Sequence, residues 1–187
     1  LKFARLPEPE TPAAVRARDV VLGTIAINNP FSRKVLISSF FQPPLREGVD
    51  EKMVRYVPCG VRPEFLAQRG KTRSDGPVLV YQTSTTNADL HGTLRLAAQR
   101  TGLSFAVYGT DREGVDSSGK LLYRGFSEEQ FLRDMVRAPF VIINGGHSAI
   151  TEALALGKPV LAEPIANQYE QMLNGWGLES LGIGMHT

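Results

Sequence analysis

From residue 78 onward, short apolar runs alternate with segments of helical spacing. The apolar runs, expected to be strands, are 78–82, 103–108, 121–126, 140–143 and 160–162. The segments that follow them with helical patterns are 88–100, 127–137, 149–156 and 168–181. Strands that are apolar throughout are typical of a parallel sheet covered on both faces. The alternation therefore predicts an α/β fold with a doubly wound parallel sheet over residues 78–187.

Local signals mark the ends of two of these helices. Gly102 follows the last residue of the first helical segment, where a glycine commonly ends a helix. Ser127 and Gln130 have the spacing of a capping box at the start of another.

The first part of the chain has a different texture. We expect a helix over residues 13–26 and two strands, 34–41 and 53–57, each closed by proline. Residues 58–77 mix proline, glycine and charge around one short apolar patch. We therefore place an interdomain linker at 58–77, with residues 1–57 belonging to one unit and residues 78–187 to another.

Composition narrows the class of protein. Of the 187 residues, 42% are hydrophobic and 21% are charged, and 21 Lys and Arg against 19 Asp and Glu leave a net charge of +2. These values exclude a disordered chain and argue against a strongly basic nucleic-acid-binding module. The single cysteine, Cys59, favours a reducing compartment, and no apolar run is long enough to cross a bilayer.

The loop with the strongest chemical signal is 144–152, between a predicted strand and a predicted helix. Ligands of such sheets bind beyond the carboxyl ends of the strands, where helix N-termini present free N–H groups. Gly145 and Gly146 permit a sharp turn, and His147 and Ser148 add donors at the helix start, so this loop suits a diphosphate. Glu152, one turn further along, can accept hydrogen bonds from ribose hydroxyls.

Segment 144–174 resembles the donor-binding segment of GT-B glycosyltransferases, which include the UDP-glycosyltransferases and the N-acetylglucosaminyltransferase of peptidoglycan synthesis. The similarity rests on the glycine loop, a glutamate followed by Ala-Leu, a Gly-x-Pro, a later proline, a Glu-Gln pair and an asparagine. In this sequence these are Gly145, Gly146, Glu152, Gly157, Pro159, Pro164, Glu170, Gln171 and Asn174. Asn144 and His147 stand where many plant-type members carry His and Trp, which indicates a divergent branch.

A second stretch adds to the resemblance. Residues 56–63 and 78–85 are similar to bacterial and archaeal glycosyltransferases of family 1 type that are loosely associated with cell-envelope or teichoic acid synthesis. In all, the resemblance covers roughly residues 35–185. It implies that residues 1–57 are the tail of an N-terminal acceptor domain and residues 78–187 a Rossmann-like donor-binding domain, cut short at its C-terminus.

The resemblance also implies roles for individual residues. Gly145, Gly146, His147 and Ser148 would hold the donor diphosphate, Glu152 the ribose, and Glu170 with Gln171 the donor sugar. The hydroxyl-rich loop after the first strand of residues 78–187 suggests Thr83 and Ser84 as further diphosphate contacts. Arg124 and Phe126, at the end of a later strand, fall where the family contacts the nucleobase.

The function implied is metal-independent transfer of a hexosyl group from a nucleotide sugar, expected to be a UDP-sugar, to an acceptor hydroxyl. No Asp-x-Asp dyad occurs, and no metal or cofactor is expected. The resemblance does not specify the acceptor, which could be a lipid-linked molecule or a glycan. The general base would lie outside this chain, so the isolated chain would transfer sugar poorly. We expect a cytoplasmic protein, peripheral to the inner membrane face. The alternatives are a nucleotide-sugar 2-epimerase and a non-catalytic nucleotide-binding domain.

Overall fold

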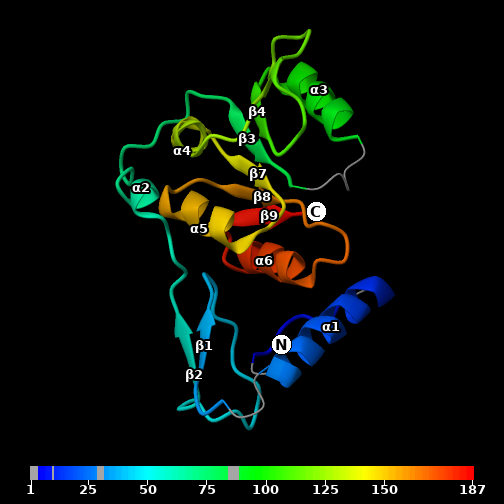
Figure 1. The fold of residues 1–187 in the computed structure, drawn as a ribbon, viewed down its shortest axis with the longest axis vertical. Coiled ribbons are helices and arrows are strands. Elements are labelled where there is room, and N and C mark those ends of the chain that lie inside the picture. Colours follow the sequence, from blue (N-terminus) through cyan, green and yellow to red (C-terminus); the bar gives the residue numbers. More distant parts are fainter. Residues whose placement is uncertain (1–3, 10, 29–31, 84–88) are drawn as a thin grey trace.

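The computed structural model describes residues 4–9, 11–28, 32–83 and 89–187. These residues form a two-stranded sheet in the N-terminal part and a seven-stranded sheet in the C-terminal part. Figure 1 shows the two parts following one another along the long axis of the molecule, joined by the segment that carries α2 (Pro63–Leu66).

The seven-stranded sheet forms the centre of the C-terminal part. Its spatial order is β5-β6-β4-β3-β7-β8-β9, and every neighbouring pair is parallel except β5–β6. The strands are β3 (Val78–Tyr81), β4 (Phe105–Tyr108), β5 (Gly114–Val115), β6 (Leu121–Tyr123), β7 (Val141–Ile143), β8 (Val160–Ala162) and β9 (Gly184–His186). This arrangement confirms the predicted α/β fold with a doubly wound, mostly parallel sheet.

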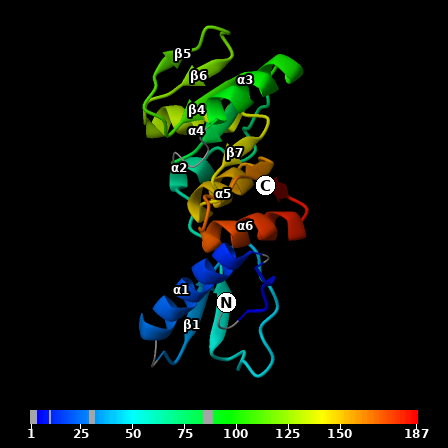
Figure 2. The same ribbon diagram turned by 90° about the vertical axis from the view of Figure 1, so that its right-hand side faces the viewer.

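Helices cover both faces of this sheet (Figure 2). Successive residues of β3 point to opposite faces: Val78 and Val80 pack under α3 (Leu90–Thr101), while Leu79 packs with α4 and α5. These two helices are α4 (Glu128–Arg137) and α5 (His147–Ala155), and α6 (Tyr169–Ser180) contributes Leu178 to the same cluster. The strands are apolar throughout because both faces are buried.

The predicted helix ends are confirmed in two places. Gly102 ends α3 in the left-handed conformation, with φ of 74°. Ser127 caps α4 through its side chain, which accepts a hydrogen bond of 3.3 Å from the Gln130 N–H. The Gln130 side chain instead donates to Asp134, so only one half of the capping box forms.

The N-terminal part consists of α1 (Pro12–Asn28) and the parallel pair β1 (Val35–Ser38) and β2 (Val54–Val57). All three elements match the predicted helix and strands. The two parts meet where α1 contacts α6 and where Phe41, Tyr169 and Leu173 form a small apolar cluster (Figures 1 and 2).

Segment 58–77, predicted to be a linker, packs against the C-terminal part. Phe65 of α2 is 2% exposed and belongs to the core beneath α4 and α5. Lys158, also buried, donates hydrogen bonds to the carbonyl oxygens of Arg73 and Ala138. The segment therefore packs onto the C-terminal part and contributes to its core.

Two strands were absent from the predicted elements. β5 has two residues, in a loop rich in glycine, aspartate and serine, and joins the sheet edge only through antiparallel pairing with β6. β9 pairs with β8 at the opposite edge, and its Met185 is exposed. Neither segment has an apolar run, because edge strands with an exposed face need little apolar surface.

Candidate functional site

The carboxyl ends of β3 and β7 meet at the point where the strand order reverses. From β3 the chain continues to β4 on one side, and β7 then joins on the other side of β3. Asn144, directly after β7, accepts a hydrogen bond of 2.7 Å from the Thr83 N–H and donates one of 3.3 Å to the Glu163 carbonyl. Such reversal points are the usual ligand sites of open α/β sheets.

The glycine loop after β7 turns sharply into α5. Gly145 has φ of 85°, and a Cβ there would lie 3.0 Å from the carbonyl oxygen of Gln171. Gly146 is the N-cap of α5, where no side chain caps the helix, and the first turn carries no acidic residue. The free N–H groups and the helix dipole therefore leave this end of α5 suited to an anion.

A cavity of about 550 Å³ opens beside this helix end. Ser148 and Glu152 of α5 line it together with Phe126, which is 77% exposed, and Tyr81 at the end of β3. The structure thus brings Ser148, Glu152 and Phe126, the residues predicted to contact the diphosphate, the ribose and the nucleobase, to one cavity. An exposed aromatic ring over a cavity offers a flat surface on which a base can stack.

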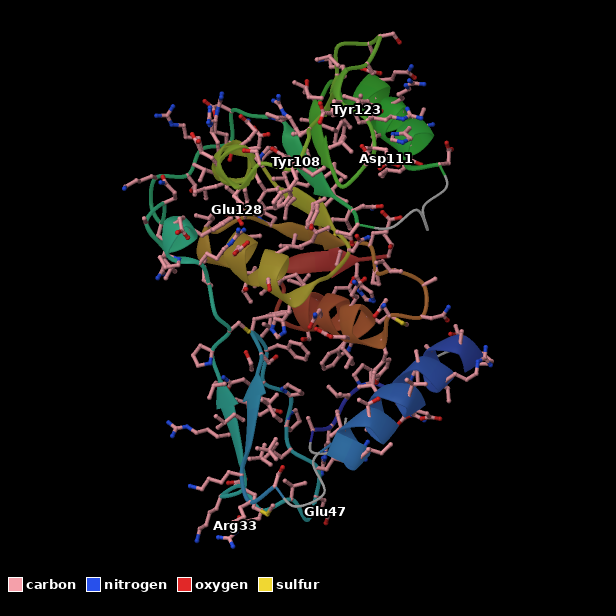
Figure 3. The ribbon with its side chains drawn as sticks, in the orientation of Figure 1. Arg33, Glu47, Tyr108, Asp111, Tyr123 and Glu128 are labelled. Carbon is pink, nitrogen blue, oxygen red and sulfur yellow. The ribbon has the colours of Figure 1, made fainter. Side chains whose placement is uncertain are left out.

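Arg124, the other predicted nucleobase contact, lies elsewhere. Its Nε is 3.5 Å from a carboxylate oxygen of Asp134, and it lines a different cavity from Phe126. Asp134 also accepts a hydrogen bond of 2.6 Å from the hydroxyl of Tyr108, which Figure 3 labels at the end of β4. Burial and the Asp134 carboxylate raise the pKa of the Tyr108 hydroxyl far above its ordinary value, so it remains a hydrogen-bond donor.

Arg62, which no sequence pattern indicated, also lines the first cavity. Its Nε lies 2.6 Å from one carboxylate oxygen of Glu152, and its Nη2 lies 3.1 Å from the other. Its Nη1 is 3.2 Å from Glu128, which Figure 3 shows at the start of α4, above α5. The guanidinium carbon also lies 4.6 Å from the centroid of the Phe65 ring. Arg62 follows the last residue of β2 by five positions, and no pattern in the sequence relates it to Glu152.

A second cavity, of about 540 Å³, lies between the N-terminal part and α6. His147 and Glu170 line it, opposite Ser38, Ser39 and Tyr56. His147 and Ser148 are adjacent at the start of α5 and line different cavities, so the predicted site residues are divided between two sides of the helix end.

His147 is held by neighbours from the N-terminal part. The Cys59 Sγ lies 2.8 Å from His147 Nε2, and the Phe40 ring packs edge-on against the imidazole at 5.6 Å. Burial lowers the pKa of His147, and the nearby Glu170 carboxylate opposes part of this decrease. Burial raises the pKa of the Cys59 thiol. The pair is therefore a neutral thiol against a neutral imidazole at neutral pH.

Gln171 and Asn174 of α6 are engaged by the backbone. The side-chain oxygen of Gln171 accepts a hydrogen bond of 2.8 Å from the Ile165 N–H, and the Asn174 amide donates one of 2.9 Å to the Gly145 carbonyl. Asn174 thus ties α6 to the glycine loop. The remaining predicted contact, Ser84, lies outside the described residues.

Within the part of the chain that the structure describes, no three His, Cys, Asp or Glu side chains gather in a group that could hold a metal ion. In the same part, none of the helices combines the length and apolar character required to cross a membrane.

The comparison with protein families decides the assignment. A family model described as "Glycosyl transferase family 1" matches residues 5–187. The chain belongs to glycosyl transferase family 1. Among curated proteins, no sequence matches this family member.

Solved structures similar to this family member share its fold. One is the glycotransferase of kitacinnamycin, with a TM-score of 0.60 and 16% sequence identity; the match covers 94% of this chain and 47% of that protein. Another is the spinosyn forosaminyltransferase SpnP, with a TM-score of 0.54 and 15% identity; the match covers 96% of this chain and 50% of that protein. A third is the calicheamicin glycosyltransferase CalG4, with a TM-score of 0.50 and 17% identity; the match covers 95% of this chain and 47% of that protein. The chain thus spans about half the length of each of these proteins. The mixed α/β fold with its mostly parallel sheet matches GT-B glycosyltransferase domains.

Proposed function

We propose that this chain is the donor-binding part of a GT-B glycosyltransferase and that it binds a nucleoside-diphosphate sugar, with UDP as the nucleotide. One observation carries the proposal: Ser148, Glu152 and Phe126 line one cavity at the reversal point of the sheet, beside the uncapped start of α5. That cavity combines an anion-binding helix end, a buried carboxylate for a diol and an aromatic surface for a base. The family match supports sugar transfer as the reaction.

In the reaction, the acceptor hydroxyl oxygen would bond to the anomeric carbon as the bond from that carbon to the diphosphate oxygen breaks, and the hydroxyl proton would pass to a general base. The free N–H groups at Gly146–Ser148 would stabilise the negative charge that develops on the leaving diphosphate. We propose that this positioned charge replaces a metal ion. The sugar would then lie toward the second cavity, where Glu170 and His147 are found.

We further propose that the second cavity lies on the acceptor side. Its walls include the apolar Phe41 and Leu173 as well as the hydroxyls of Ser38, Ser39 and Tyr56. Such a lining suits an acceptor with an apolar body and a hydroxyl group. Residues 1–57 would be the part of an acceptor domain that this chain contains, and the single cysteine agrees with a cytoplasmic protein.

The test is isothermal titration calorimetry of the 187-residue chain with UDP. We expect the wild type to bind and Glu152→Ala to bind about tenfold or more weakly, because hydrogen bonds to a charged group are lost. Glu129→Ala is the matched control, since Glu129 lies on the exposed face of α4, where it pairs with Arg133. Equal affinities for wild type and Glu152→Ala would refute the ribose role. No binding by the wild type would refute the nucleotide site.

A further inference from the structure

Glu152 is a buried carboxylate whose two oxygens are both engaged. Its side chain is 6% exposed, and Arg62 meets it side-on through Nε and Nη2 at 2.6 and 3.1 Å. Burial of an unpaired carboxylate is costly, and a bidentate guanidinium offsets this cost while fixing the plane of the carboxylate. Glu152 therefore has one orientation in the cavity.

This pairing leaves acceptor capacity on Glu152. A carboxylate offers about four lone-pair sites, of which the guanidinium takes two. Glu152 lines the same cavity as Ser148 and Phe126, so the remaining sites are available to a ligand there. The two remaining sites point away from each other, so a hydroxyl group of a ligand in the cavity can donate to the carboxylate oxygen that faces it.

Arg62 is itself held in place from three sides. Besides Glu152, it contacts Glu128 of α4 at 3.2 Å and lies over the ring of Phe65. Its own segment is fixed against α5, where the Thr151 hydroxyl is 3.4 Å from the Gly60 carbonyl. The arginine therefore bridges segment 58–77, α4 and α5.

We infer that Arg62 is a positioning residue of the donor site, which orients the Glu152 carboxylate to receive a hydroxyl of the ribose diol of the nucleotide. This inference rests on the proposed function. It assigns to segment 58–77 a part in nucleotide selection, because the arginine that aims the diol-binding carboxylate comes from that segment.

The experiment compares the affinities of UDP and 2′,3′-dideoxy-UDP by calorimetry for wild type, Arg62→Gln and Arg62→Lys. Arg62→Gln should weaken UDP binding about tenfold and leave 2′,3′-dideoxy-UDP binding unchanged, because only the diol depends on the orientation of Glu152. Arg62→Lys keeps the charge without the bidentate geometry and should give a smaller loss of the same kind. Arg69→Gln is the control, since Arg69 is exposed in the same segment.

A double-mutant cycle separates action through Glu152 from direct contact. In a Glu152→Gln background, Arg62→Gln should have no further effect on UDP affinity. An equal loss of affinity for both nucleotides, a further loss in the Glu152→Gln background, or tighter UDP binding by Arg62→Gln would each overturn the inference alone. Wild type that fails to bind UDP would overturn the proposed function and the inference together. Thermal unfolding of each variant verifies that it is folded, and Arg62→Lys provides the test if Arg62→Gln is not.

Discussion

At the scale of single residues, the site depends on a few contacts between segments that are distant in the chain. Asn144 joins the ends of β3 and β8 to that of β7, and Asn174 holds the glycine loop from α6. Arg62 meets Glu152 across 90 positions of sequence. Motifs and resemblance predicted which side chains would contact a nucleotide, whereas these contacts determine which of them share a cavity.

Gly145 is the residue whose backbone the loop most requires. Gly145→Ala should destabilise the fold by about 1–2 kcal/mol, because an L-residue is strained at its φ of 85°. The added Cβ would also lie 3.0 Å from the Gln171 carbonyl oxygen and press on the first turn of α6. Thermal or urea unfolding measures the change.

The neighbouring glycine supplies the control for this substitution. Gly146 has φ of −64°, and a Cβ there would meet no atom within 4 Å. Gly146→Ala should therefore change stability by less than about 1 kcal/mol, the range of an N-cap preference. If the two variants were equally stable, the conformational requirement at Gly145 would be disproved.

At the scale of elements, apolar runs and caps identified the central strands and the helices. The five strands predicted from apolar runs after residue 77 all form, because each lies in the interior of the sheet and is buried on both faces. The edge strands β5 and β9 were not predicted, since backbone pairing rather than side-chain burial holds them. The pattern thus indicates burial, not membership of a sheet.

The start of α4 tests how much one cap contributes. Ser127→Ala removes the side-chain acceptor of the Gln130 N–H and should lower the free energy of unfolding by about 1 kcal/mol. Ser117→Ala, at an exposed loop position, is the matched control and should leave stability within about 0.5 kcal/mol. Chemical denaturation of both variants decides the matter; equal midpoints would mean that the cap is dispensable.

At the scale of the whole molecule, the segment between the two sheets packs as part of the C-terminal part. Its composition resembles a linker, yet Phe65 is buried in the core and Arg62 lines the first cavity. The first cavity therefore has walls from both sides of the boundary at residue 77. A change in segment 58–77 should affect both the core and the site.

Phe65→Ala tests the anchoring of this segment. Removal of a buried phenyl ring should cost about 3 kcal/mol, and it also removes the ring beneath the Arg62 guanidinium. The adjacent Leu66 is 44% exposed, so Leu66→Ala should cost less than about 1 kcal/mol. Hydrogen exchange of residues 60–70 should rise in Phe65→Ala only; similar exchange in both variants would show that Phe65 does not anchor the segment.

The fold class, the central strands and helices, and the loop at which a ligand is expected could all be predicted from the order of residues along the chain. This was possible because burial on two faces and helix capping are local patterns of residue type. Three features became evident from the folded chain: Arg62 pairs with Glu152, Arg124 contacts Asp134 and lines a different cavity from Phe126, and His147 and Ser148 line different cavities. These outcomes depend on how segments far apart in the chain pack together, and no local pattern records that packing.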